Sequence, residues 1–576
     1  MAAHPPVPGL YTSGLNQEPF NLAVYYQEHY RGLFKTALSA GEIRPLVIPW
    51  SLVGSFFLPL LYLSIPHVNK PWLYRMRWLV AAAVFNLNAR LMQTTSAVNE
   101  AIAYATGLLA TWGTINALRL LIFTRPQWDA ARVERRPRGT ENGSKEGIEK
   151  QPPVVPPDES VAASLRHFEY VWQPFPATGP FLARLGWTAD LITALRGAGW
   201  NFSISSIPHP PFPSKKNLEG EPVRLDMIPL VSRTGTARSP TYASFLSARL
   251  LEFSLSYITI DLLTTTIRQD PYFVLGPDYR FHSYPLPASY SRLPFPQLTI
   301  PLLFRGPPAM AGIIAGLHLY YSFLQLAIVF PLRSLFGVRA ELWQHPSLFG
   351  GLVPSVLDRG LAGFWGGWWH QTFRAGFVAP ARWLLRLRSH NHHHHSDPHT
   401  RPCSHKSTRE NKMHQILLES FLAFTLSGLV HSAGGYTAVP RTNRPWTPIA
   451  FFVFQAVGII LQVATSALVN HFIAQSFALL TGADKPPKKV IIPRWLRRIA
   501  NLVYTILWLY LTAWGLIDDM SRAGVWLFEP VPISPFRLMG FGSPGNTNWW
   551  RWDRVGYRLG WYTGRQGRWW ESGVTM

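Results

Sequence analysis

The chain has a single cysteine in 576 residues, Cys403. It can therefore form no intramolecular disulfide, and neither a Cys-rich zinc site nor an iron–sulfur cluster can be built. Acidic residues are also few, 31 Asp and Glu against 54 Lys and Arg, which gives a formal net charge of +23. An excess of this size indicates an anionic partner, such as nucleic acid, lipid headgroups or a phosphate-bearing cofactor.

Several common catalytic motifs are missing as well. The sequence contains no G-x-S-x-G elbow, Walker loop or H-E-x-x-H motif, which excludes the usual soluble hydrolase, nucleotide-binding and zinc-protease patterns. Residues 1–44 lack the basic and apolar regions of a cleavable signal peptide, so we expect the first membrane span to direct insertion. We find no internal repeat.

What the sequence does have is long apolar blocks. A hydrocarbon core about 30 Å thick requires roughly 20 mostly apolar residues per helix. We therefore expect an all-α fold, a multi-pass transmembrane helical bundle of about eight spans with cytosolic amphipathic segments. The expected spans cover residues 45–66, 78–95, 101–123, 244–267, 309–333, 413–434, 449–480 and 499–517. In the second of these, Asn86, Asn88 and Arg90 must face protein or water rather than lipid.

These spans divide the chain into five parts. They are an N-terminal extramembrane segment (1–44), a first transmembrane group (45–123), a cytosolic loop (124–243), a main membrane core (244–530) and a C-terminal tail rich in Trp and Arg (531–576). Basic residues lie between the apolar blocks, as in the loop with Lys70, Arg75 and Arg77. This pattern favours a bilayer and a phosphate-bearing ligand over nucleic acid, and predicts cytosolic loops and a lumenal N-terminus.

The tail does not follow this rule. Eight spans would place it in the lumen, although it contains Arg551, Arg554, Arg558, Arg565 and Arg568. Either the number of spans differs or the tail violates the positive-inside rule. Its tryptophans suit a membrane interface, where an amphipathic ring can lie at headgroup depth: Trp549, Trp550, Trp552, Trp561, Trp569 and Trp570.

Two polar inserts interrupt the chain. Residues 137–160 are rich in Pro, Glu, Lys and Gly and predict a flexible linker. Residues 389–412 include four consecutive histidines, His392–His395. Consecutive histidines in a low-complexity loop lack the hydrogen-bonding partners that orient metal ligands, so we predict no metal site.

The first segment that could carry chemistry is FWGGWWHQTFR, residues 364–374. It is too polar for a simple span, and its aromatic residues predict an amphipathic or re-entrant piece at the membrane surface that holds His370 at a fixed depth. Interfacial anchoring alone would explain the same composition.

The second is FLAFTLSGLVHSAGGY, residues 421–436, an apolar helix with a single ionisable side chain, His431. Ser427 lies four residues earlier on the same helix face. An ionisable group within a span indicates a functional site, and a neutral imidazole can accept a proton near pH 7. Glu252, Asp261 and Glu419 also lie in expected spans, and any of them could orient a histidine or pair with a neighbouring helix.

Taken in this order, the two segments resemble the membrane-bound O-acyltransferase superfamily, specifically its wax-synthase-like branch. The superfamily has an aromatic motif with Asn or His followed by an invariant membrane-embedded His, and His370 and His431 match this pair. Further similar elements are LRGAGWNFSISSIP (195–208), with Phe202 where Trp is usual, LWQHPSLFG (342–350) and GRQGRWWESG (564–573). One departure is Gly366-Gly367, where the branch often carries a basic residue.

The resemblance implies transfer of an acyl group, in our interpretation acetyl from acetyl-CoA, to a hydroxyl of a lipophilic acceptor in secondary metabolism, with no permanently bound cofactor. His431 would remove the hydroxyl proton and His370 would position the thioester. Substrate contacts would come from Trp365, Trp369, Gln371, Arg374, Ser427, Trp200 and Asn201. We expect a protein of the endoplasmic reticulum membrane.

Three alternatives stay open. The same resemblance fits a long-chain wax ester synthase, since fold and family do not fix the substrate. A non-catalytic transporter or scaffold could retain the helices, although transporters commonly have paired halves with broken helices. A histidine-box oxygenase of the desaturase type is disfavoured because the histidines outside the 390–405 insert are scattered.

Overall fold

The computed structural model of the chain describes residues 21–137, 165, 167–213, 219–279, 292–395, 405–481, 492–542, 548–552, 559–564 and 567–575. For residues 387–395 and 405–414 it describes the backbone alone. The expected linker beyond residue 137, the side chains of His392–His395, and Arg554, Arg558 and Arg565 lie outside this description.

The described chain is mainly helical. The longer helices are α1 (Leu22–Ser39), α4 (Arg77–Thr94), α5 (Glu100–Leu118), α8 (Phe181–Thr193), α9 (Tyr242–Ile267), α13 (Gly306–Val329), α16 (Arg374–His395), α17 (His405–Thr437), α18 (Trp446–Thr481) and α19 (Arg494–Thr512). Shorter helices connect them: α2 (Leu58–Ser64), α3 (Pro71–Arg75), α6 (Pro126–Asp129), α10 (Pro271–Leu275), α12 (Pro296–Thr299), α14 (Arg333–Phe336), α15 (Asp358–Gly363), α20 (Trp514–Arg522) and α21 (Pro535–Leu538). Turns of π-helix precede α2, follow α5, precede α13, precede α15 and follow α15, the last being η9 (Phe364–Trp368).

The strands are short. β1 (Arg44–Pro45) runs parallel to β3 (Thr95–Ser96), and β4 (Ala131–Pro137) pairs antiparallel with β5 (Phe168–Pro174). A three-stranded sheet joins β2 (Val47–Ile48), β7 (Gly573–Thr575) and β6 (Gly560–Tyr562). The sheets therefore decorate a helical bundle, and the expected all-α membrane fold is confirmed.

Six helical stretches of the described chain are long and apolar enough to cross a membrane. They are Glu100–Phe123, Tyr242–Ile267, Pro296–Val329, Gln415–Thr437, Trp446–Thr481 and Arg494–Arg522, and each overlaps an expected span. The other two expected spans are helical but do not meet this standard. Trp50–Ser64 is shorter, and residues 45–48 form strands instead, while α4 is too polar.

The polar residues of α4 explain its lower hydropathy. Asn88 is buried, donates to Thr114 Oγ1 at 3.0 Å and accepts from Ser55 Oγ at 3.0 Å. It therefore faces its protein neighbours, as expected of a polar group in a span, whereas Asn86 and Arg90 are exposed.

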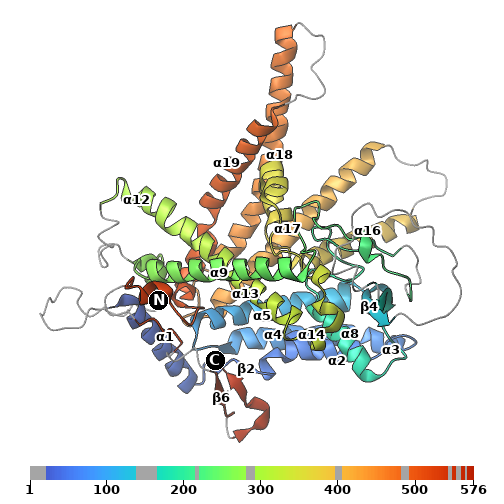
Figure 1. Ribbon diagram of the computed structural model, residues 1–576, viewed down its shortest axis with the longest axis horizontal. Helices are drawn as coiled ribbons and strands as arrows, with labels where there is room; N and C mark the ends of the chain where they lie inside the picture. The colour runs from blue at the N-terminus through green and yellow to red at the C-terminus, as the bar shows by residue number, and fades with distance from the viewer. Residues whose placement is uncertain are drawn as a thin grey trace, which may run out of the picture.

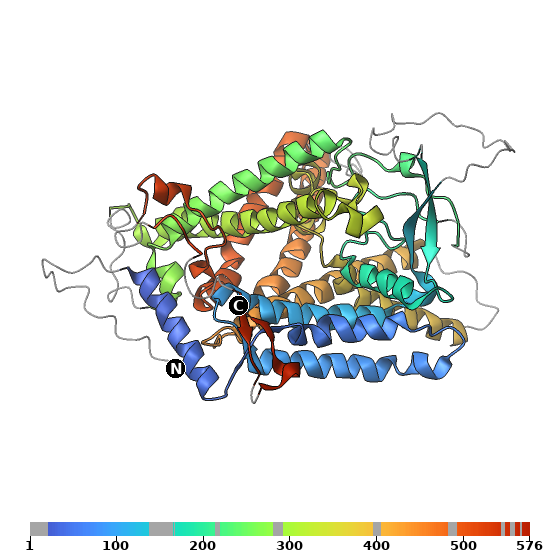
Figure 2. The same ribbon diagram turned by 60° about the horizontal axis from the view of Figure 1, so that its bottom comes forward.

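Helices α9 and α13 lie side by side over the bundle, and α18 and α19 project from it at a steep angle (Figure 1). Turned by 60°, the molecule shows α9 and α13 on one side, the blue helices of the N-terminal third on the other, and the orange helices between them (Figure 2). The strands β4 and β5 lie at the end opposite to α1 (Figure 2). The C-terminal half thus supplies the middle of the bundle.

Small residues let α17 approach its neighbours closely. A Cβ added at Gly107 of α5 would collide with the backbone of Ala433 in α17. A Cβ added at Gly428 of α17 would come within 2.6 Å of Ile449 Cα in α18. Close backbone approach at small residues is the usual way in which helices associate inside a bilayer. The position of α17 therefore depends on these glycines.

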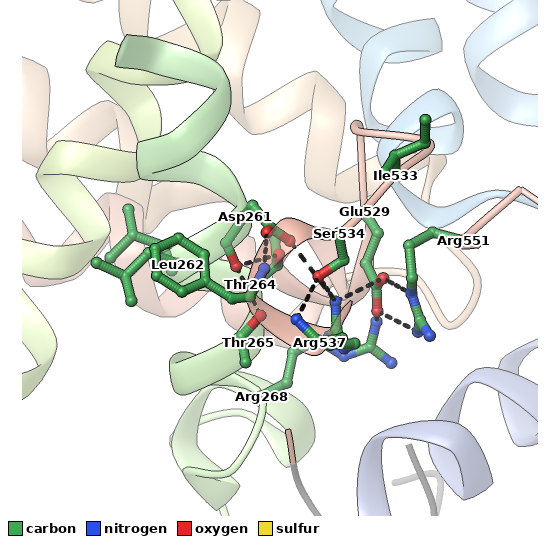
Figure 3. Close-up of polar contacts among 12 residues, drawn as sticks. Asp261, Leu262, Thr264, Thr265, Arg268, Glu529, Ile533, Ser534, Arg537 and Arg551 are labelled. Atoms are coloured by element: carbon green, nitrogen blue, oxygen red, sulfur yellow. Dashed lines mark hydrogen bonds and ion pairs between the residues drawn. The ribbon is translucent and has the colours of Figure 1, made fainter. Parts of the chain in front are cut away.

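Buried ion pairs attach the tail to α9 (Figure 3). Glu529 pairs with Arg268, Arg537 and Arg551, and all four side chains are 3% exposed or less. Asp261 of α9 accepts from the backbone N–H of Phe536 at 3.0 Å. Buried charges are stable only when they are paired in this way.

These ion pairs help to explain why the tail contains arginines although eight spans would place it in the lumen. Arg551 is buried and shares the Glu529 carboxylate with Arg268 and Arg537, so it is not an exposed loop charge of the kind that the positive-inside rule counts. β7 of the tail pairs with β2, which directly precedes the first helical hairpin. The tail therefore lies on the same side of the bundle as residues 44–48, which the loop charges predict to be lumenal.

We predict that Gly428→Leu lowers the melting temperature of the detergent-solubilised protein by several degrees, because overpacking a tight helix contact costs about 1–3 kcal/mol. Gly316→Leu in α13 is the matched control, since an added Cβ there meets nothing within 4 Å. Thermal unfolding of both variants measures the difference. Equal melting temperatures would contradict the close contact.

We predict that the tail and the N-terminal strands share one membrane side. In a Cys403→Ser background, Glu42→Cys and Leu559→Cys should react with a membrane-impermeant maleimide only after sealed microsomes are opened. Arg75→Cys should react in intact microsomes. All three positions are exposed, so access depends on the side alone. Labelling of Leu559→Cys together with Arg75→Cys would place the tail in the cytosol.

Candidate active site

The aromatic segment turns back into the bundle at η9. Trp365 packs edge-on against Phe424 of α17 and against Phe451 and Phe452 of α18, with ring centroids 5.7, 6.2 and 5.8 Å away. Its indole N–H donates to Gln455 Oε1 at 3.2 Å. The segment is therefore packed against α17 and α18 through the ring of Trp365.

Gln371 braces this turn from within. Its amide nitrogen donates to the carbonyl oxygens of Trp365 at 2.6 Å and Trp369 at 2.8 Å. Its amide oxygen accepts from Arg374 Nη1 at 3.1 Å. Gln371 therefore positions the aromatic turn through both ends of its side chain, and the substrate contact that the sequence predicts for it stays a prediction.

His370 follows the turn among aromatic rings. Its imidazole lies 5.2 Å from the ring of Trp369, 6.0 Å from Phe373 and 6.4 Å from Phe349, measured between centroids. Nδ1 is buried and has no hydrogen-bond partner among the described residues. Burial, with smaller contributions from His431 and Arg196, lowers the pKa of His370 to about 3. The ring is therefore neutral at physiological pH.

His431 lies on α17 and faces the same region. Its imidazole stacks on Phe452, with centroids 5.1 Å apart and an interplanar angle of 19°. Phe452 also contacts Trp365, so one phenyl ring links the His431 helix to the aromatic turn. Nδ1 of His431 is likewise buried without a hydrogen-bond partner in the described part of the chain. The fold thus brings together the two histidines singled out in the sequence.

Ser427 lies one turn before His431 and makes no side-chain hydrogen bond among the described residues. Trp369 closes the turn, stacked on Phe364 with centroids 5.7 Å apart.

The carboxylates that the sequence left as candidates for orienting a histidine have other partners than His370 and His431. Glu419 pairs with Arg382 and Asp261 binds the tail. Glu252 pairs with His318, a different histidine, at 3.7 Å.

A cavity of about 810 Å³ opens beside this site, next to the loop expected to be cytosolic. Five arginines contribute to its lining, together with Asp129 as its one acidic residue: Arg119, Arg125, Arg374, Arg382 and Arg386. Arg374 also donates to the carbonyl of Gly366 at 3.3 Å and to Gln371. It therefore connects the cationic cavity to the aromatic turn that carries His370.

The LRGAGWN element forms another wall of the cavity, through Asn201 and Phe202. Asn201 accepts from the N–H of Ala131 at 3.1 Å and donates to the carbonyl of Asp129 at 2.8 Å, so it also fixes the start of β4. Trp200 is fully buried against Trp187, with centroids 5.0 Å apart, and does not line the cavity. The sequence predicts substrate contacts for both Trp200 and Asn201. Asn201 lines the cavity, whereas Trp200 is a residue of the hydrophobic core.

Several site residues were missed in the sequence. Arg119 lines the cavity and lies 5.4 Å from the centre of the Phe202 ring, and it falls within an expected span. Arg249 and His318 also fall within spans. An ionisable group within a span indicates a functional site, and this applies to Arg119, Arg249 and His318, so the sequence did contain a signal for them. Phe349 and Phe452 gave no signal, because one aromatic residue among many looks like any other.

The comparisons with known proteins agree with this geometry. Residues 345–454 match the model of the membrane bound O-acyl transferase family, a segment that contains both His370 and His431. The chain is 25% identical over 292 residues to O-Mevalon transferase yanI of Aspergillus niger, which covers 49% of this chain and 53% of that protein. It is 22% identical over 292 residues to O-Mevalon transferase macI of Penicillium terrestre, which covers 48% of this chain and 52% of that protein.

The alignment thus spans about half the length of each curated relative. No solved structure matches the chain. The family segment and the two relatives together confirm the resemblance to the membrane-bound O-acyltransferases.

Proposed function

We propose that the chain is a membrane O-acyltransferase that moves an acyl group from a coenzyme A thioester to the hydroxyl of a lipophilic acceptor. The observation that carries the proposal is the convergence of His370 and His431. They lie on separate segments, meet within one aromatic cluster, and each has a buried Nδ1 without a hydrogen-bond partner among the described residues.

In the proposed reaction His431 acts as general base. It takes the proton of the acceptor hydroxyl as the hydroxyl oxygen attacks the thioester carbonyl carbon. The C–O bond forms, the C–S bond breaks, and the CoA thiolate leaves and takes up the proton from the imidazolium. No acyl-enzyme is required. Positioned proton transfer of this kind contributes typically about 10²- to 10⁴-fold to the rate.

His370 has the complementary role of holding the thioester. A neutral imidazole has one N–H donor and one acceptor nitrogen, and its depressed pKa keeps it in this form. A donor fixed by packed rings can stabilise the negative charge that develops on the carbonyl oxygen, without reorganising during the reaction. Trp369 and Phe373 flank the ring on two sides.

The cationic cavity suits the nucleotide end of coenzyme A. CoA carries phosphate groups, and Arg side chains bind phosphate through charge-assisted, often bidentate hydrogen bonds. Five arginines around one cavity supply these donors beside the turn that carries His370. We assign Arg374 to the pantetheine end because it alone among them bonds to this turn.

The two fungal relatives are named O-Mevalon transferases, which supports transfer of a group to oxygen, and the choice of substrates extends the resemblance described above. We infer acetyl-CoA as donor, a hydroxylated terpenoid or meroterpenoid as acceptor, and the endoplasmic reticulum as location. A long-chain alcohol giving a wax ester is the second candidate, because the outward faces of the spans are apolar and fit either acceptor.

We predict that His431→Ala loses at least about 100-fold in kcat while its abundance stays unchanged. His471→Ala is the matched control, since His471 is an exposed histidine on α18. Both variants are expressed in microsomes, and CoA release and ester formation are followed with acetyl-CoA and longer acyl-CoAs against terpenoid and fatty alcohols. Equal activity of wild type and His431→Ala would remove His431 as the base. An inactive wild type would favour a non-catalytic scaffold.

We predict that Arg382→Gln/Arg386→Gln raises the KM for acyl-CoA about 100-fold or more, because two charge-assisted contacts are lost and each costs about 1.5–3 kcal/mol. The effect should shrink with a donor that lacks the 3′-phosphate or the nucleotide. Arg90→Gln, exposed on α4 and outside the cavity lining, is the control. An unchanged KM in the double variant would exclude CoA from this cavity.

A further inference from the structure

A second histidine site lies between α9 and α13. Glu252 of α9 faces His318 of α13, with Oε2 3.7 Å from Nδ1. Arg249 holds the other carboxylate oxygen at 2.8 Å, and the Ser322 hydroxyl lies 3.4 Å from Oε2. Ionisable groups in a membrane span are costly to bury and usually mark a functional site.

The pair faces inward. Glu252 continues the buried stripe of α9 that contains Phe245, Arg249, Ser256 and Ile260, and His318 continues the buried stripe of α13 that contains Ala315, Ser322, Gln325 and Val329. Ser322 and Gln325 are 1% and 2% exposed, whereas the side chains of Glu252 and His318 remain 28% and 25% exposed. The pair is therefore partly accessible next to buried polar neighbours, so a ligand can reach it.

One aromatic ring separates this pair from the proposed catalytic site. His318 lies 4.8 Å from the ring of Phe349, with an interplanar angle of 36°. Phe349 in turn lies 5.2 Å from Trp368 and 6.4 Å from His370. The imidazoles of His318 and His370 thus both lie next to the ring of Phe349, and one fused-ring skeleton is long enough to extend from one imidazole to the other.

A hydrogen-bonded frame fixes the pair. Arg249 Nη1 donates to Gln325 Oε1 at 3.1 Å, and Gln325 donates to the carbonyl of Pro346 at 3.2 Å. Arg196 of the LRGAGWN element donates to the same Pro346 carbonyl at 3.0 Å. The frame therefore fixes Arg249, which pairs with Glu252, against the two loop elements that carry Pro346 and Arg196, and the Glu252 carboxylate faces His318 from this fixed position.

We propose that Glu252 and His318 form a specificity site for a second hydroxyl of the acceptor, remote from the hydroxyl that reacts. This rests on the proposed function. The carboxylate favours a proton on His318 Nδ1, which leaves Nε2 as a hydrogen-bond acceptor. A hydroxyl donates to such a nitrogen, and an apolar skeleton packs on Phe349. The acceptor is then a polycyclic diol rather than a simple fatty alcohol.

The test compares a terpenoid diol with the matched alcohol that lacks the second hydroxyl. His318→Leu should reduce the preference for the diol, expressed as the ratio of the two kcat/KM values, about tenfold. His318→Gln keeps an acceptor oxygen and should retain much of the preference. The KM for acyl-CoA should be unchanged in both. His471→Leu on α18 controls for loss of an intramembrane histidine.

A binding measurement separates this proposal from acyl transfer itself. The diol should raise the melting temperature of purified His431→Ala protein more than the matched alcohol does, and adding His318→Leu or Glu252→Gln should abolish the difference. This readout requires no turnover, so it stays valid if the wild type transfers no acyl group. Equal shifts by both alcohols, a preference that survives His318→Leu, or a changed KM for acyl-CoA alone would each overturn the assignment.

Discussion

Polar groups inside an apolar helical bundle have to find their partners within the protein, and most of this structure follows from that constraint. Asn88 binds Thr114 and Ser55, Gln455 bridges Trp365 and Thr512, and Arg305 forms a two-pronged pair with Asp270. Each such pair fixes one helix against another, because an unpaired buried polar group costs about 1–3 kcal/mol.

Against this background the two histidines stand out through their surroundings. Other buried atoms also lack hydrogen-bond partners among the described residues, such as Tyr104 Oη and Trp200 Nε1, so the lack alone does not identify a site. His370 and His431 differ because the aromatic turn, braced by Gln371 and packed against α17 and α18, brings one toward the other. The turn adds no regular helix to the bundle. Its position is best explained by the side chain that it presents, His370.

The sequence predicted the helical membrane fold because hydropathy blocks are a local signal. It singled out His431 as an isolated imidazole in an apolar helix, and His370 by the aromatic motif around it. It did not predict that Trp200 is a core residue or that Gln371 is a brace, since both depend on which backbone groups lie nearby in space. The pairing of β2 with β7 joins residues more than 500 positions apart and has no local signature. Arg551 illustrates the same limit: its charge was visible, but its burial and its pairing with Glu529 were not.

The arrangement of charges separates the routes of the two substrates in the proposed reaction. The arginine-lined cavity lies beside β4 and the start of α16, and it suits the polyanionic donor. The Glu252–His318 pair lies between two spans with apolar outer faces, beyond Phe349, and suits an acceptor dissolved in the bilayer. A hydrophilic donor and a lipophilic acceptor can therefore reach the histidines from different directions and be bound at the same time. When both substrates are bound together, the acyl group can pass directly from donor to acceptor, and no acyl-enzyme intermediate has to hold it while one substrate replaces the other.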